Sequence, residues 1–431
     1  MRSQRQAGRS SFLLGTLAVL AITIAVVLSA CSPAAQSVPT QGVGTDSAAP
    51  RTDSAAPNTD SAARSTSEPP ATDSAAPATS EPPDETSAPH LTIGFGFEDL
   101  QATEWEDVAQ RLDAVGADGI TLAVGRPEWT AFPWPGHEER WAAGVEAGDD
   151  VVADVLDQIA TAADGREREV TLVIDTLMPQ ALEQNPELAG VSDDRDTSDA
   201  FPNATAAAGA VGEEIVALCG AVAERYQPDR IALTELILEH TYTDSDLEMF
   251  AEWAERDVDE GWPDHVDPLL GEWRASIITD LVARCGEAAG EWGTVVDMDV
   301  RANWDEPGGD RLESGHAYAA LLDSGANLTV WNYFPLNDRS PEYSAEIAAG
   351  LAQRFTPEEL DRVTLSVGLW TDGDDDSAGA ATEGVLAPAD LEAALTSSIE
   401  GGARRVSVTP HSMMTEAHWD TLPEWNAVQA G

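Results

Sequence analysis

Short apolar runs rich in Val, Ile and Leu recur from about residue 90 to the C-terminus, and amphipathic stretches separate them. A bounded apolar run of about four to eight residues predicts a buried strand, whereas apolar positions at helical spacing predict one buried helix face. The predicted strands are 91–97, 119–125, 169–176, 229–236, 294–303, 327–334, 362–370 and 404–412. The predicted helices are 103–115, 149–164, 207–226, 245–257, 267–289, 314–324, 341–354, 388–400 and 415–422. Gly116, Gly325 and Gly402 predict C-terminal helix ends.

Strands and helices alternate in one uninterrupted series, which predicts an α/β fold with a single (β/α)8 TIM barrel over residues 90–431. The alternative, a doubly wound sheet, usually has fewer strands and a glycine-rich phosphate-binding turn after the first one. Here the first strand is followed by EDLQATEWE, which offers no such turn. The pattern therefore favours the barrel.

The N-terminal 30 residues are typical of a signal peptide. Arg2, Arg5 and Arg9 precede the apolar run FLLGTLAVLAITIAVVL, and LSAC follows it and ends at Cys31. This ending resembles a bacterial lipobox, which implies cleavage before Cys31, lipid attachment to its thiol, and anchoring on the extracytoplasmic face of the cell membrane. An ordinary signal peptide or an uncleaved membrane anchor is the alternative.

Residues 32–89 are of low complexity. The repeat TDSAAP occurs at 45–50, 52–57 and 72–77, and the segment has no aromatic residue. Such a segment buries too little apolar surface to offset the entropy of ordering, so we expect a disordered linker between the anchor and the barrel.

Composition excludes several classes of function. The formal net charge is −54, which would repel nucleic acid. All 23 basic residues are Arg, so Schiff-base and pyridoxal-phosphate chemistry on a lysine is excluded. The seven His residues form no HExxH motif, so we expect no catalytic metal. We also expect a monomeric protein.

Two cysteines remain besides Cys31. Cys219 and Cys285 fall on predicted helices that are expected to be neighbours in space. They either form a disulfide or remain as two buried free thiols.

In a (β/α)8 barrel the functional groups lie where the strands end, so the residues leaving each strand define a candidate site. The fifth predicted strand places Asp297, Asp299, Arg301 and Asn303 on one side, at a spacing of two. Crowded carboxylates in a closed barrel have shifted pKa values, as acid–base catalysis requires. The alternative is a polar barrel interior in which Arg301 pairs with Asp299.

Aromatic residues collect at the same strand ends. Rings stack on the apolar faces of sugars, and neighbouring polar groups bind the hydroxyls, so this composition is typical of a carbohydrate site. The candidate binding residues are Arg126, Trp129, Trp134, Asp175, Arg301, Asn303, Trp331, Asn332, Tyr333, Trp370 and His411.

The fourth strand carries the most specific signal. The passage VAERYQPDRIALTEL resembles the helix-to-strand-four passage of TIM-barrel glycoside hydrolases, near clan A and the family-ten-like putative glycosidases. The resemblance implies that Glu235 is the acid/base, although Thr234 stands where those enzymes carry Asn. The second Glu of that clan, after strand seven, is replaced by Asp372.

We therefore predict a surface-anchored, glycoside hydrolase-like barrel in which Glu235 protonates the leaving oxygen. Either Asp299 or Asp372 acts as the nucleophile or activates a water. The alternative is a catalytically degenerate barrel that binds carbohydrate without cleaving it.

One further segment, DGDDDSAGAATE, has the spacing of a calcium loop. Its candidate ligands are Asp372, Asp374, Asp376 and Glu383. Ser377 stands where such a loop needs Gly, and a strand precedes the segment, so a solvated acidic loop is the alternative and no other cofactor is expected.

Overall fold

The computed structural model describes residues 89–146, 148–265, 267–371 and 384–429. The predicted signal peptide, Cys31 and residues 32–88 of the predicted linker lie outside the described residues. So do Asp372 and the calcium-like segment that ends at Glu383. Within the described part of the chain, no helix is both long enough and apolar enough to cross a membrane.

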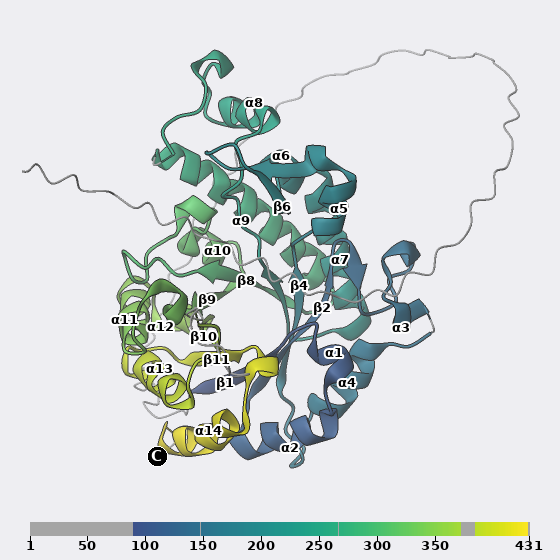
Figure 1. Cartoon of the computed structure of the whole chain (residues 1–431), viewed down its shortest axis with the longest axis vertical. Helices are drawn as coiled ribbons and strands as arrows, with labels where there is room; N and C mark the ends of the chain where they lie inside the picture. Colours follow the sequence, from purple (N-terminus) through teal and green to yellow (C-terminus); the bar gives the residue numbers. More distant parts are fainter. Residues whose placement is uncertain (1–88, 147, 266, 372–383, 430–431) are drawn as a thin grey trace, which may run out of the picture. The chain divides into compact units, whose positions relative to one another are not determined.

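Eight parallel strands close into a barrel, as the sequence predicts (Figure 1). Hydrogen bonds join the strands in the order β1-β11-β10-β9-β8-β7-β4-β2, and β2 pairs with β1 to close the ring. The barrel strands are β1 (His90–Phe95), β2 (Gly119–Arg126), β4 (Glu169–Asp175), β7 (Arg230–Thr234), β8 (Val295–Arg301), β9 (Asn327–Asn332), β10 (Val363–Gly368) and β11 (Arg405–Thr409). Each overlaps a predicted strand, so the fold prediction is confirmed.

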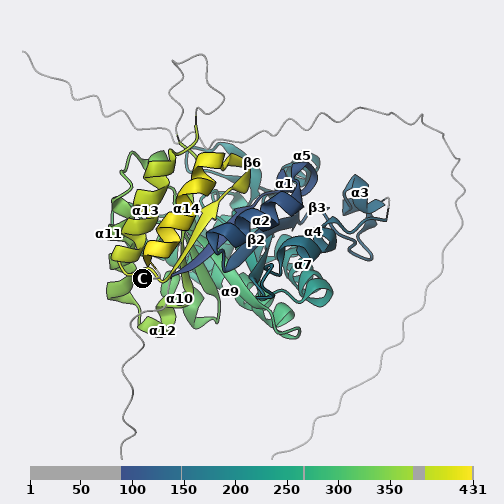
Figure 2. The same ribbon diagram turned by 90° about the horizontal axis from the view of Figure 1, so that it is seen from below.

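Helices surround the strands and cover their outer faces (Figure 1). The helices that follow successive barrel strands are α2 (Trp105–Val115), α4 (Val151–Ile159), α7 (Ala210–Tyr226), α9 (Pro268–Gly290), α10 (Tyr318–Asp323), α11 (Tyr343–Arg354), α13 (Pro388–Glu400) and α14 (Glu416–Gln429). The last helix, α14, packs beside α2 and so completes the outer layer (Figure 2). Gly116, Gly325 and Gly402 lie at the ends of α2, α10 and α13 with positive φ, which confirms their predicted role.

The sequence pattern missed most of the short elements in the loops. These are β3 (Trp129–Thr130), the hairpin of β5 (Ala189–Val191) and β6 (Thr197–Pro202), and the helices α1 (Asp99–Ala102), α3 (Ala143–Glu146), α5 (Pro179–Gln184), α6 (Ala204–Ala208), α8 (Asp244–Trp253) and α12 (Pro357–Leu360). Only α8 was predicted, as 245–257. The predicted helix 207–226 is divided into α6 and α7, because Gly209 interrupts it outside the helical conformation.

Small and polar side chains face the barrel axis, and large aliphatic ones face the helices. On β1, Leu91 and Ile93 are fully buried. Gly94, the residue after Ile93, faces inward, where an added Cβ would lie 2.8 Å from the hydroxyl of Thr409 on β11. The interior therefore has room for polar side chains on the other strands.

An ion network fills the end of the barrel where the strands begin. Arg405 pairs with Glu169, and because β11 and β4 are not neighbours, this contact crosses the interior. Arg230 lies 3.0 Å from Glu169 and 3.3 Å from Asp297, and the Asn327 amide donates to Asp297 at 2.7 Å. Asp297 thus belongs to a paired interior layer and not to the barrel mouth, as the polar-interior alternative proposed for this residue.

The two described cysteines lie where helices α7 and α9 pack together. Their sulfur atoms are 2.6 Å apart, both side chains are fully buried, and the bond between them is not formed in this structure. The predicted proximity of Cys219 and Cys285 is confirmed, and the disulfide stays a prediction.

Candidate functional site

Glu235 is the first residue after strand β7, at the mouth of the barrel. Its φ is 58°, in the left-handed region, where a residue with a Cβ is strained by roughly 1–3 kcal/mol. Burial is the main cause that raises its pKa to about 7, and the charge of Asp175 raises it further, against Arg301 and Arg126. A strained, half-buried carboxyl that holds a proton near neutral pH is typical of a functional group.

Asp299 lies on the neighbouring strand β8 and faces the same space. Burial raises its pKa to about 7, and the charges of Asp297 and Glu235 add to this. The side chains of Thr234 and Trp331 donate hydrogen bonds to its carboxylate and act in the opposite direction. Glu235 has no such donor among the described side chains. The two groups therefore have raised pKa values and different surroundings.

An aromatic wall stands beside the two carboxyls. The Tyr333 ring stacks on Trp331 with centroids 5.3 Å apart, and the tilted ring of Trp370 lies 5.1 Å from that of Tyr333. Burial and the nearby charges of Asp299 and Glu235 raise the pKa of the Tyr333 hydroxyl. Phe201 and Ile237 join Trp331 in a small apolar cluster that is separate from the main core. The mouth thus combines two carboxyls with an apolar surface.

The Tyr333 ring occupies this place because strand β10 ends in a glycine. A Cβ at Gly368 would overlap the ring of Tyr333. Only a residue without a side chain lets the ring lie against the backbone there.

Two arginines flank the carboxyls, and each has its own acidic partner. The Arg126 Nε and Nη2 atoms donate to Asp175 at 2.9 and 2.6 Å. Arg301 Nη1 donates to Glu239 at 2.9 Å, and the Ser314 hydroxyl donates to the same oxygen at 2.6 Å. The alternative in which Arg301 pairs with Asp299 is therefore wrong for this pair. Arg301 reaches past the strand to a carboxylate in the β7–α8 loop, so Asp299 has no ion pair with a cation among the described residues.

Glu239 is a functional-site candidate that the strand-end reasoning did not select. Burial acts to raise its pKa, but Arg301, Ser314 and Arg311 lower it overall. The sequence did carry a signal for Glu239, which is a charged residue shortly after the apolar run of β7. Phe201, which lies in the apolar cluster at the mouth, carried no such signal, because it belongs to a hairpin that the pattern did not predict.

Of the other predicted residues, some lie near the strand ends at the barrel mouth and others support the scaffold. Trp129, half-buried, packs edge-on against Phe97 at 5.0 Å and stays near Arg126. His411 accepts or donates a 2.7 Å hydrogen bond with Asp99 beside strand β1, so it forms a second polar group at strand ends. Its ring lies 4.8 Å from that of Phe95.

Three predicted residues serve the scaffold in this structure. Asn332 is fully buried and donates to Ser344 of α11 at 2.7 Å, because the strand alternation turns it outward. Trp134 is 5% exposed and stacks on His137 at 3.7 Å, so little of its surface is available to a ligand. Asn303 holds the β8–α10 loop through hydrogen bonds with Asp310 and Glu306.

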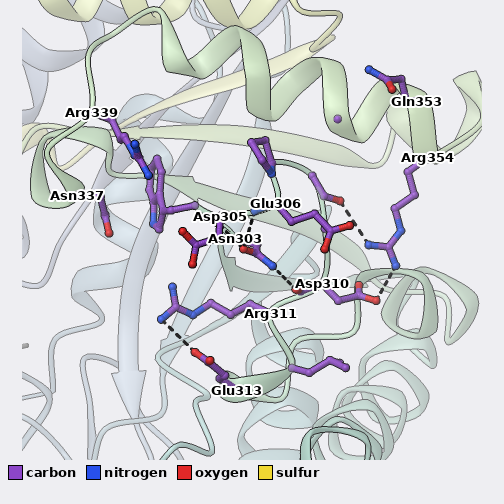
Figure 3. A pocket seen from close by; sticks show the side chains of 16 residues that line it. Asn303, Asp305, Glu306, Asp310, Arg311, Glu313, Asn337, Arg339, Gln353 and Arg354 are labelled. Atoms are coloured by element: carbon purple, nitrogen blue, oxygen red, sulfur yellow. Dashed lines mark hydrogen bonds and ion pairs between the residues drawn. The ribbon is translucent and has the colours of Figure 1, made fainter. Parts of the chain in front are cut away.

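A cavity of about 1220 Å3 lies next to this site. It is lined by the β8–α10 loop, the turn after β9 and helix α11, and neither Glu235 nor Asp299 lines it (Figure 3). Among the described residues, no group of three or more His, Cys, Asp or Glu side chains is arranged to hold a metal ion.

No protein-family model matches the sequence, and no curated protein matches it either. Solved structures do match. The glycoside hydrolase domain of PgaB (BpsB) from Bordetella bronchiseptica has a TM-score of 0.56 and 11% sequence identity, over 80% of this chain and 98% of that one. The β-galactosidase of the haloarchaeon Halorubrum lacusprofundi has a TM-score of 0.54 and 11% identity, over 79% and 58%.

The α-L-fucosidase isoenzyme 2 of Paenibacillus thiaminolyticus has a TM-score of 0.51 and 14% identity, over 79% of this chain and 49% of that one. At such identities these similarities show a shared fold. The resemblance to the TIM-barrel glycoside hydrolases is therefore confirmed at the level of the barrel.

Proposed function

We propose that the protein hydrolyses a glycosidic bond at the mouth of its barrel. One observation carries the proposal: Glu235, directly after β7, and Asp299, on the adjacent strand β8, lie within each other's electrostatic influence, and burial raises the pKa of each to about 7. A pair of carboxyl groups that differ in protonation is what glycoside hydrolysis needs.

The surroundings assign a role to each carboxyl. Thr234 and Trp331 donate to Asp299, and such donors favour the ionised form. Glu235 lacks them, so we assign the proton to Glu235, which gives it to the leaving oxygen as the glycosidic C–O bond breaks. Asp299 then attacks the anomeric carbon or takes a proton from the attacking water.

The aromatic wall supports a sugar as the ligand. The stacked rings of Trp331 and Tyr333 offer an apolar surface beside charged groups. The flanking Arg126 and Arg301 side chains are held by carboxylates and are available to bind hydroxyls. The fold shared with three carbohydrate-active structures is consistent with this ligand class.

We also propose that a lipid on Cys31 anchors the barrel at the extracytoplasmic face of the cell membrane, with residues 32–89 as the tether. The support is the LSAC sequence after an apolar run. The test is membrane fractionation of cells that express the wild type or Cys31→Ser. Release of only the variant supports the anchor, and equal retention of both contradicts it.

The test of catalysis is hydrolysis of a panel of polysaccharides and aryl glycosides by the purified full chain. We expect Glu235→Gln and Asp299→Asn each to lower kcat by about 10²–10⁴-fold, which is the usual contribution of a general acid or base. Glu98→Gln is the matched control, because Glu98 is an exposed strand-end carboxylate that accepts from Ser412. Activity that survives both site variants would overturn the assignment. Binding of a glycan without cleavage would favour the degenerate, carbohydrate-binding barrel.

A further inference from the structure

The cavity beside the candidate site is built by the loops that leave strands β8 and β9. Asn303 and Arg311 come from the first loop, and Asn337 comes from the second, where its amide donates to the Tyr333 carbonyl at 3.1 Å. The strand that carries Asp299 and the segment that begins at Tyr333 therefore lead into the cavity walls a few residues later. Site and cavity lie side by side on the same end of the barrel.

A chain of charged groups connects the two. Arg301, next to Glu235, pairs with Glu239 at 2.9 Å. Arg311 lies 3.9 Å from the same oxygen of Glu239 and lines the cavity. Its Nη2 atom is 4.0 Å from Glu313, and Figure 3 shows the side chain pointing toward that residue.

Several lining groups have no fixed partner. The Nε atom of Arg311 is buried without a hydrogen bond. Among the described residues, Arg339 forms no ion pair, and its guanidinium lies 4.9 Å from the Tyr343 ring. The carboxylates of Asp305 and Glu306 are exposed and unpaired within the same part of the chain. Donors and acceptors are thus both available to a ligand.

The cavity also offers one aromatic face. Trp304 is half-buried, and its ring lies 5.8 Å from that of Tyr343. The Tyr343 hydroxyl donates to the Trp304 carbonyl at 2.6 Å, which fixes the residue against α11. An indole held in this way can stack on a sugar ring at little further entropic cost.

The charges of the lining indicate the kind of ligand. Asp305, Glu306, Asp310 and Glu313 are nearly balanced by Arg311, Arg339 and Arg354. Arg354 and Asp310 neutralise each other at 2.6 Å. A strongly anionic ligand would meet the unpaired carboxylates, and a strongly cationic one would meet Arg311 and Arg339. Alternating acceptors and donors suit hydroxyl groups instead.

We propose that this cavity is a subsite for a neutral glycan, which holds the sugars that extend beyond the bond at Glu235 and Asp299. Its volume of about 1220 Å3 exceeds the ~300–1,000 Å3 of ordinary small-molecule pockets, so it suits more than one ring. The subsite rests on the proposed function, because it takes the substrate of that same site. The substrate is accordingly a poly- or oligosaccharide, and a short glycoside fills only part of the surface.

The experiment measures binding of the full chain to a glycan array that runs from disaccharides to long neutral oligosaccharides, with uronate-containing chains as anionic probes. The Glu235→Gln background prevents cleavage. Trp304→Ala is added to remove the aromatic face, and Trp292→Ala is the matched control, because Trp292 is 40% exposed and follows α9 at the helix-to-strand side of the barrel.

We expect long neutral chains to bind at least about tenfold more tightly than disaccharides, a difference of about 1.4 kcal/mol. Trp304→Ala should remove this length dependence and leave disaccharide binding within about twofold, while Trp292→Ala changes neither. Equal binding of all lengths, an unaffected Trp304→Ala variant, or a preference for uronate chains would overturn the subsite.

The outcomes separate the subsite from the catalytic proposal. If binding depends on glycan length and requires Trp304, but the wild-type protein cleaves no substrate, the subsite is supported and catalysis is contradicted. Cleavage without length dependence supports catalysis and contradicts the subsite. If no glycan binds at all, the subsite is overturned.

Discussion

Two aspartates on strand β8 experience opposite environments although they are two residues apart and both face the barrel axis. Asp297 lies 3.3 Å from Arg230 and accepts from Asn327 at 2.7 Å. Burial still raises its pKa, but the guanidinium opposes the change. Within the described part of the chain, Asp299 has only the uncharged donors Thr234 and Trp331, and burial raises its pKa to about 7.

The difference teaches how one strand can serve both structure and chemistry. A buried carboxylate that pairs with a guanidinium stays ionised and ties strands together. A buried carboxyl without a cation exchanges its proton near neutral pH, as an acid or base must. The lower layer of the barrel interior holds the first kind, and the mouth, with Asp299 and Glu235, holds the second.

The largest expected effect comes from breaking the lower layer. Arg230→Met leaves Asp297 and one oxygen of Glu169 without their cation inside the barrel. We expect a loss of about 3–5 kcal/mol in the free energy of unfolding, measured by urea denaturation at neutral pH. The double variant Arg230→Met with Asp297→Asn should recover part of the loss, because it removes the uncompensated charge. A single variant as stable as the wild type would show that the network contributes nothing.

Substitution of a carboxyl at the mouth should stabilise the protein, in contrast to the loss of stability expected for Arg230→Met. The pKa of Glu235 is raised from 4.5 in the unfolded chain to about 7 in the fold. Between these values the folded state holds a proton that the unfolded state has lost, so stability falls as pH rises through this window. Glu235→Gln removes the charge and should stabilise the protein by about 2–3 kcal/mol at about pH 8.5, with no difference near pH 4.

Thermal unfolding of the two proteins at both pH values checks this prediction. Glu98→Gln is again the control, and it should change stability at neither pH. A Glu235→Gln variant that is destabilised at high pH would mean that the charged carboxylate is compensated in the fold.

The layout of the barrel and the position of Glu235 could be predicted because both depend on local pattern. Apolar runs and helical periodicity mark the strands and helices, and a carboxylate directly after a strand must lie at the barrel mouth. Asn332 shows a local signal that was not used. The period of two that brings Trp331 to the interior turns Asn332 outward to Ser344.

The local pattern could not predict which acidic residue of β8 lacks an ion-pair partner within the described residues. Arg230, Asn327 and Glu239 are distant in sequence, and they reach Asp297 and Arg301 only when the strands close into a ring. The cavity is equally non-local, since it needs the β8–α10 loop and helix α11 together.

The next largest effect concerns the shape of the mouth. Gly368→Ala places a methyl group where the Tyr333 ring lies. Because Tyr333 is half-buried and can move outward, we expect kcat/KM to fall roughly 5–30-fold, which corresponds to about 1–2 kcal/mol of transition-state stabilisation. The loss in the free energy of unfolding should be smaller. Kinetics and thermal unfolding of the same preparation separate these effects. Gly286→Ala, where an added Cβ meets nothing, is the control, and equal kinetics in both variants would contradict the role of Gly368.

The smallest expected effect tests the hydrogen bonds that distinguish Asp299 from Glu235. Thr234→Val keeps the shape of the side chain and removes a donor to Asp299, so the pKa of Asp299 should rise further. Since Asp299 must be ionised to act, the acidic limb of the kcat/KM profile should move upward by roughly 0.5–1 pH unit, and the alkaline limb set by Glu235 should stay. Thr176→Val is the matched control, because the Thr176 hydroxyl donates only to the Thr234 carbonyl at 3.0 Å. A shift of the alkaline limb instead would exchange the roles of the two carboxyls, because the ionised partner would then be Glu235.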